Sequence, residues 1–188
     1  MGSGRIVTGW IECPVIDPTV VRTLRDQLYG WLGAPDPYRR ESDPHVSVFG
    51  VRLPLEKRDA FETAFESFAD SIGPRCESVD GYHLYPSVRN PMVVSLDVSF
   101  DLDAVASPIA DLLAGHGGRI GRGPTPPHVT LFKGGVRGEE LQWAQLDESV
   151  RTRLRSVRTD GDTPLDPPSA VVCPTFEITL GRPRLTWN

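Results

Sequence analysis

The same short pattern occurs twice in this chain, and the repetition constrains the fold more than any other feature. Residues 43–50 read DPHVSVFG and residues 126–133 read PPHVTLFK, so in each copy a histidine is followed by an apolar residue, a hydroxyl residue and a second apolar residue. A histidine with such followers arises by chance at roughly 2% of histidines, and the chain has four histidines. We therefore expect the two copies to occupy equivalent places in a duplicated structure.

Each copy predicts a β-strand whose polar side chains share one face. Side chains alternate between the two faces of a strand, so His45 and Ser47 point away from the face that carries Val46. His128 and Thr130 repeat this arrangement in the second copy. Two positions along a strand are about 7 Å apart, a spacing that suits two groups holding one phosphate.

Length and composition indicate a soluble globular protein. The 188 residues can bury a substantial core, and no apolar run is long enough to span a bilayer. No signal sequence opens the chain, so we expect a cytoplasmic protein without a membrane partner. The net charge of −5 argues against a general nucleic-acid coat protein, but it leaves room for a nucleotide or an RNA end in a locally basic cleft.

The cysteines and histidines do not predict a metal site or a cofactor. Cys13, Cys76 and Cys173 are odd in number and widely separated among apolar residues, a pattern that favours reduced, buried thiols. His45 and His128 lack the closely spaced second ligand of familiar metal motifs. We therefore expect neither a metal nor a cofactor.

The first half of the chain predicts the order strand, helix, histidine strand, helix, strand. We expect strands at residues 6–15, 45–52 and 75–85, and helices at 18–32 and 55–72. The Asp80-Gly81 pair leaves open a tight hairpin turn in place of a continuous third strand.

The second half repeats this order. We expect strands at residues 92–100, 128–133, 170–180 and 184–187, a helix that ends near Gly115, and a helix at 138–157. Pro108 either kinks the first of these helices or, with Ser107 as its cap, begins its main part. The loop before the second histidine strand is expected to bring Arg119 and Arg122 near the mouth of a cleft.

The duplication predicts one bilobal domain over residues 1–188, with lobe-forming repeats at about 5–85 and 92–180. The expected fold class is α+β: a two-lobed, pseudo-twofold, duplicated fold with mixed or antiparallel sheets lining a central cleft and helices on the outside. In this arrangement the two histidine strands would face each other across the cleft. A base would need an aromatic platform beside them, for which the candidates are Tyr38, Phe49, Tyr85 and Phe132.

The two tetrads, their separation of 83 residues (128 − 45) and the duplicated layout resemble the 2H phosphoesterase superfamily. The resemblance is greatest to its 2′-5′ RNA ligase-like and cyclic phosphodiesterase branch, and it covers roughly residues 5–180. It implies that His45 and His128 are catalytic and that Ser47 and Thr130 hold phosphate oxygens. A basic residue a few places beyond the second motif often helps to bind phosphate in this family, and Lys133 occupies that place.

The resemblance implies a metal-independent phosphodiesterase acting on 2′,3′-cyclic phosphates or 2′,5′-linked nucleotides or RNA. Displacement at phosphorus needs a base on one side and an acid on the other, and two imidazoles suit both tasks near neutral pH. We favour His128 as the base and His45 as the acid, and the sequence leaves the reverse assignment open. The expected partner is a nucleotide or an RNA terminus, bound by a monomer.

Three alternatives stay open at this point. The same site could hydrolyse a small cyclic or 2′,5′-linked signalling nucleotide, or it could ligate RNA through a 2′,5′-linkage. The protein could also be a noncatalytic module that binds an RNA end or a nucleotide.

Overall fold

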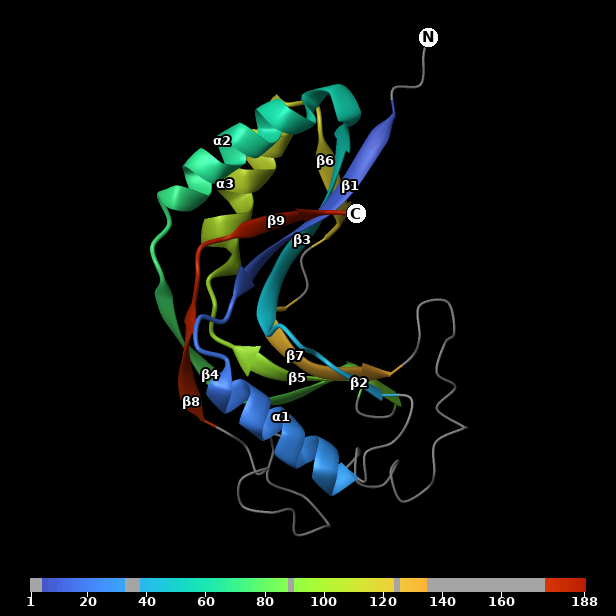
Figure 1. Cartoon of the computed structure of the whole chain (residues 1–188), viewed down its shortest axis with the longest axis vertical. Helices are drawn as coiled ribbons and strands as arrows, with labels where there is room; N and C mark the ends of the chain where they lie inside the picture. Colours follow the sequence, from blue (N-terminus) through green and yellow to red (C-terminus); the bar gives the residue numbers. More distant parts are fainter. Residues whose placement is uncertain (1–4, 33–37, 88–89, 124–125, 135–174) are drawn as a thin grey trace.

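The strand pairs in the described part of the chain, residues 5–32, 38–87, 90–123, 126–134 and 175–188, are antiparallel and form one sheet of nine strands. In this computed structural model the order is β8-β4-β5-β7-β3-β1-β9, with β2 paired to β7 and β6 paired to β3. The sheet is strongly curled, and the described α-helices lie on its convex side (Figure 1). The expected α+β fold class, with helices on the outside, is confirmed.

The described strands are β1 (Ile6–Pro14), β2 (Tyr38–Arg40), β3 (His45–Pro54), β4 (Arg75–Ser87), β5 (Asn90–Val98), β6 (Arg119–Arg122), β7 (His128–Gly134), β8 (Phe176–Leu180) and β9 (Arg184–Trp187). The helices are α1 (Thr19–Leu32), α2 (Arg58–Asp70) and α3 (Leu102–Gly115), and the short 3-10 helix η1 (Leu55–Lys57) precedes α2.

The core lies between the convex face of the sheet and the helices. Strand residues at alternate positions are buried there, as the period of two predicts: Ile11 and Cys13 on β1, and Val94, Leu96 and Val98 on β5. The helices bury residues three or four positions apart, which are Val21, Leu24 and Leu28 on α1, Phe61, Phe65 and Ala69 on α2, and Val105, Ile109 and Leu113 on α3. The concave face of the sheet is therefore left for polar side chains.

The two halves of the chain exchange elements around the histidine strands. The short strand β2 precedes the first histidine strand, β3, but pairs with the second, β7. The short strand β6 precedes β7 but pairs with β3. The helices follow the same rule, because α1 packs against β7 and α3 packs against β3. Each histidine strand is thus supported by elements from both halves, as pseudo-twofold symmetry requires.

The histidine strands do not face each other across a cleft, as we expected. They are neighbours in the sheet, joined antiparallel through the pair Val46 and Val129. That expectation assumes that each half of the chain forms a sheet of its own. In the structure the strands of both halves belong to one continuous sheet, and the two histidine strands pair with each other in its middle.

Most elements lie where the sequence predicts them, with two differences in the strands. Strand β4 continues through Asp80 and Gly81, and Gly81, at a φ of 133°, lies in a bulge against β5, so the hairpin alternative is wrong. Strands β2 and β6 occupy segments expected to be loops. The expected helix 138–157 and residues 170–174 of the expected strand 170–180 lie outside the described residues.

Helix α3 runs through Pro108 as one element. Its N-cap is Asp101, whose carboxylate accepts a hydrogen bond from the backbone N–H of Ala104 at 3.1 Å. The alternative in which Ser107 caps a helix beginning at Pro108 is therefore wrong. None of the helices in the described ranges is long and apolar enough to cross a membrane.

The cysteines differ in their surroundings. Cys13 is buried as expected, and burial raises the pKa of its thiol to about 12, although Arg75 lowers it slightly. Cys76 is exposed on β4, so the expectation of a buried thiol is wrong there. Cys173 lies outside the described residues.

Candidate active site

The centre of the concave face is organised by the pair Val46 and Val129, which joins the two histidine strands. Both valine side chains are fully buried on the convex side. Their chain neighbours therefore point to the concave side. In an antiparallel pair the flanking residues lie opposite each other, so this register sets two cross-strand pairs. These pairs are His45 with Thr130 and Ser47 with His128.

The four side chains form the corners of one small patch. Each histidine is directly opposite a hydroxyl residue of the other strand, at a typical Cβ separation of about 5 Å. The two histidines are diagonal to each other, at a typical separation of about 7–8 Å. This register therefore brings two imidazoles and two hydroxyls to one area of the concave face.

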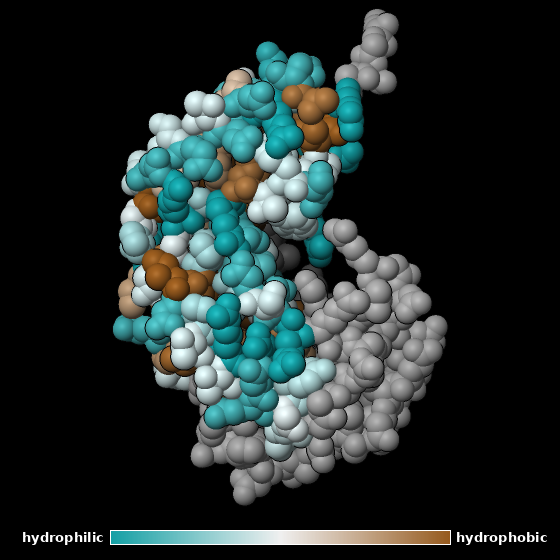
Figure 2. All heavy atoms as spheres, in the orientation of Figure 1, coloured by the Kyte–Doolittle hydropathy of each residue, from teal (hydrophilic) through white to brown (hydrophobic). Residues whose placement is uncertain are grey.

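A pocket of about 170 Å³ opens at this patch and contains three of the residues that the sequence singled out: Ser47, His128 and Thr130. Its other lining residues are Trp10, Val48, Val93, Arg122 and Gly123. His45 is not one of its lining residues. Figure 2 shows the molecule hollowed on the concave side, next to the part that carries β1 and β6.

Both imidazole rings are held in the same way by the backbone. Nδ1 of His45 lies 2.7 Å from the carbonyl oxygen of Asp43, and Nδ1 of His128 lies 2.8 Å from that of Pro126. A carbonyl can only accept, so Nδ1 carries the hydrogen and donates it in both rings. A proline follows each of these carbonyls and favours an extended backbone there. Nε2 is therefore the nitrogen left to exchange a proton with a ligand.

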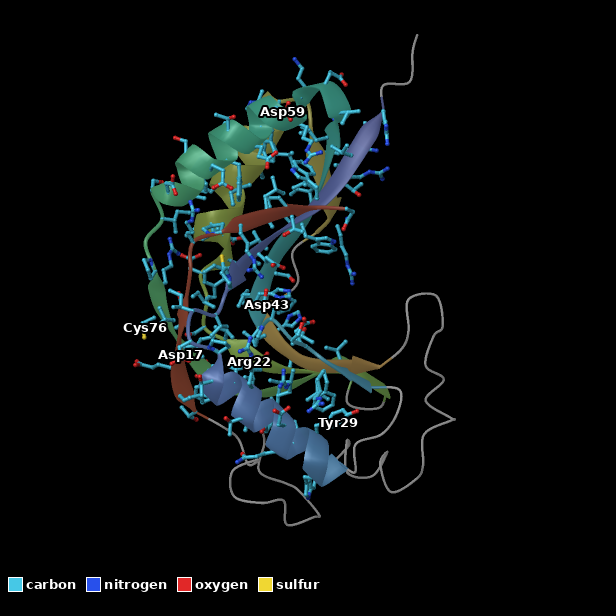
Figure 3. All side chains as sticks on the ribbon, viewed as in Figure 1. Asp17, Arg22, Tyr29, Asp43, Asp59 and Cys76 are labelled. Atoms are coloured by element: carbon cyan, nitrogen blue, oxygen red, sulfur yellow. The ribbon has the colours of Figure 1, made fainter. Side chains whose placement is uncertain are left out.

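His45 has a further contact through Nε2. This nitrogen lies 3.3 Å from Oε2 of Glu12 on β1. The guanidinium of Arg184 on β9 donates through Nε to Oε1 of Glu12 at 2.7 Å, and another of its nitrogens donates to the carboxylate of Asp43. Arg184 thus joins the two residues that hold the two nitrogens of the His45 ring. Figure 3 shows Asp43 at the start of β3, near the centre of the curled sheet.

Both nitrogens of the His45 ring therefore lie close to an oxygen atom, the carbonyl of Asp43 for Nδ1 and the carboxylate of Glu12 for Nε2. Arg184 is itself strongly bound: burial lowers the pKa of its guanidinium, but hydrogen bonds to Asp43 and Glu12 outweigh this and raise the pKa above its usual range.

The second half places a carboxylate at a related position. Asp97 on β5 is the cross-strand neighbour of His128, and Ser95 is the neighbour of Thr130. Asp97 is half-buried and Ser95 is fully buried. Each histidine strand therefore has an acidic residue on the strand at its outer side, Glu12 for one half and Asp97 for the other.

The aromatic residue at the pocket is one that sequence reasoning missed. Trp10 lines the pocket, and the guanidinium of Arg122 lies 6.0 Å from the centre of its ring. The alternation of side chains along β1 could have identified it, because Ile11 and Cys13 face the core and Trp10 must therefore face the concave side. Arg122 lies at the pocket as expected.

The aromatic residues proposed from the sequence do not form a platform on the described surface. Phe49 and Phe132 are buried in the core, so their assignment to the cleft is wrong. The backbones of Tyr38 and Tyr85 lie in β2 and β4, and their side chains lie outside the described part. The same holds for Lys133, whose backbone pairs with Arg39 and Val93 and whose role in binding phosphate stays a prediction.

No protein-family model and no curated protein sequence matches the chain. Among solved structures, LigT from E. coli in complex with 3′-AMP is similar over 96% of this chain and 95% of that chain, with 16% identity and a TM-score of 0.46. Usb1 from Kluyveromyces marxianus with uridine monophosphate is similar over 81% and 80%, with 14% identity and a TM-score of 0.46.

A third structure, described as a phosphoesterase, is similar over 72% of this chain and 81% of that chain, with 18% identity and a TM-score of 0.41. The three proteins are of the superfamily that the sequence resembles. Likenesses of this strength carry no residue role and no substrate over to this chain. Its function has to be argued from the geometry of the concave face.

Proposed function

We propose that the protein is a metal-independent phosphodiesterase of the 2H type, which opens a 2′,3′-cyclic phosphate or cleaves a 2′,5′-linkage at a nucleotide or RNA end. The observation that carries this proposal is the pair of diagonal histidines, His45 and His128, each held at Nδ1 by a backbone carbonyl two residues earlier. In this proposal both rings offer Nε2 to one ligand, and the ring of His45 does so next to Glu12. This is the arrangement that acid–base catalysis at one phosphorus atom needs.

In the proposed reaction Nε2 of His128 removes a proton from a water molecule, and the water oxygen attacks phosphorus. The bond between phosphorus and the ribose oxygen on the opposite side breaks, and Nε2 of His45 gives its proton to that oxygen. The hydroxyls of Ser47 and Thr130 donate hydrogen bonds to the nonbridging oxygens, where negative charge develops. The diagonal placement of the two imidazoles supports this in-line geometry.

The surroundings of His45 support its role as the acid. Its Nε2 lies 3.3 Å from the carboxylate of Glu12. A carboxylate can only accept a hydrogen bond, so this contact is a hydrogen bond when Nε2 carries the proton that the acid gives to the leaving oxygen. No equivalent contact to Nε2 of His128 is present among the described residues, which supports His128 as the base.

Phosphorus NMR of a 2′,3′-cyclic nucleotide incubated with the protein in EDTA tests this proposal. We expect the signal of the cyclic phosphate to be replaced by that of a phosphomonoester, and its position reports which ribose oxygen keeps the phosphate. Parallel incubations with a 2′,5′-linked dinucleotide and with RNA ending in a cyclic phosphate compare the substrate classes. Binding without turnover of any of these substrates between pH 5 and 9 would contradict the proposal and favour a noncatalytic module.

A further inference from the structure

Three arginines lie together on the concave face next to the pocket. Arg52 on β3 is the direct cross-strand partner of Arg119 on β6. Arg122, at the other end of β6, pairs with Gly50 and lines the pocket. All three side chains are exposed. We call Arg52, Arg119 and Arg122 the arginine strip.

Burial on the neighbouring positions shows which way the strip faces. Val51 and Leu53 are buried in the core, so Arg52 between them points to the concave side, and its partner Arg119 does the same. The stem of Arg52 lies across Gly121, where a Cβ atom would be 2.8 Å from Cγ of Arg52. The glycine thus leaves space for this side chain to lie over β6, between Arg119 and Arg122.

The strip is unfavourable for the protein alone. Like charges directly opposite each other on antiparallel strands destabilise the pair. Other arginines of this chain, such as Arg25, Arg182 and Arg184, have carboxylate partners. Within the described ranges the arginine strip forms no ion pair, although the chain carries a net charge of −5. A bound polyanion would relieve this repulsion.

We propose that the arginine strip binds the phosphodiester backbone of an RNA strand whose 3′-terminal phosphate occupies the pocket. This inference rests on the proposed function for the identity of the terminal group. The strip begins at the pocket with Arg122 and extends along β3 to Arg52, so a ligand that reaches both must carry repeated negative charges along a chain. A mononucleotide has a single phosphate group and does not offer such a series of charges. The ring of Trp10, which is the cross-strand neighbour of Gly50, provides a surface on which a base can stack between the pocket and Arg52.

The proposal predicts that RNA is bound much more tightly than a mononucleotide and in a salt-dependent manner. Each phosphate contact to a single strand contributes about 0.7 to the slope of log affinity against log salt concentration. Replacement of two arginines should therefore lower this slope by about 1.4. The affinity for RNA at low salt should fall at least about tenfold, since phosphate contacts dominate the binding.

The experiment measures fluorescence anisotropy with an eight-nucleotide RNA that ends in a 3′-phosphate, a ligand that cannot be turned over. The double variant Arg52→Gln/Arg119→Gln is compared with Lys57→Gln/Arg182→Gln, which removes the same charge from exposed residues near α2. We expect loss of RNA affinity in the first variant only, with the affinity for a 3′-mononucleotide unchanged within about twofold.

Equal RNA affinity in the two double variants would overturn the proposal. Equal affinity of the wild-type protein for RNA and for polyglutamate of the same charge would overturn the assignment to a nucleic acid backbone. The binding measurement does not depend on turnover, so its outcome is separate from that of the phosphorus NMR experiment. If Arg52→Gln/Arg119→Gln loses RNA affinity but the wild-type protein shows no turnover, the arginine strip is supported and the phosphodiesterase proposal is rejected. If the wild-type protein shows turnover but the variant binds RNA as tightly as the wild type, the phosphodiesterase is supported and the arginine strip is rejected.

Discussion

Glu12 is the residue that distinguishes the two otherwise equivalent histidines. It contacts Nε2 of His45 and is held from the other side by Arg184. We expect Glu12→Gln to lower kcat about tenfold, because the ring of His45 and the guanidinium of Arg184 both lose the carboxylate that they contact. Steady-state kinetics on a 2′,3′-cyclic nucleotide measure this loss.

The control for this prediction is Glu12→Asp, which keeps a carboxylate and should retain more of kcat than Glu12→Gln, with a similar KM in both variants. A purely structural role for Glu12 would lower the unfolding temperature of Glu12→Gln in parallel with its activity. An unchanged kcat in Glu12→Gln would contradict the assignment of Glu12 as a positioning residue for His45. Strand alternation predicts that Glu12 on β1 faces away from the core, but its proximity to His45 depends on the pairing of β1 with β3.

Strand β9 brings Arg184 to the histidine from the far end of the chain. Its Trp187 packs edge-on against Phe61 of α2, with the ring centres 6.4 Å apart. On the other side β9 pairs with β1, where Gly9 lies opposite Trp187. A Cβ atom at Gly9 would be 2.7 Å from the backbone oxygen of Thr186 and 2.9 Å from the ring of Trp187. The position therefore requires glycine for the close approach of the two strands.

We expect Gly9→Ala to lower the free energy of unfolding by about 1–3 kcal/mol, because the added methyl group pushes β9 away from β1. The matched control is Gly73→Ala, where a Cβ atom meets nothing within 4 Å. Thermal and urea unfolding of both variants measure the difference. Equal stability of Gly9→Ala and the wild-type protein would show that β9 is not held as closely as the structure describes.

The sequence predicts the bounds of individual helices and strands better than the pairing between the strands. The bounds of α1 and β3 follow from local signals, which are the proline and glycine around the helix and the alternation of the strand. Strands β2 and β6 carry no such signal, since they are short and are stabilised by pairing with the histidine strand of the other half. The sequence predicted Arg119 and Arg122 near the cleft but missed their neighbour Arg52, and it missed the contact of Arg184 with Glu12, because these partners are distant in sequence and meet only through sheet pairing.

At the scale of the whole molecule, each half of the chain supports the histidine strand of the other half. Because β2 and α1 support β7, while β6 and α3 support β3, neither half completes its own histidine strand. The two strands meet at Val46 and Val129. The sequence predicted two histidine strands with polar residues on one face, and the catalytic and phosphate-binding roles of those residues stay a prediction. It could not show that they lie on adjacent strands, because strand order is a long-range property.

The steady-state rates of His45→Ala, His128→Ala and the double variant on the same 2′,3′-cyclic nucleotide test the central claim most directly. If the two imidazoles act on one phosphorus atom, each single variant should lose about 10²–10⁴-fold in kcat. The double variant should lose little more than the worse single variant, because the two groups act as a unit. Full activity in either single variant, or losses that multiply in the double variant, would contradict the account.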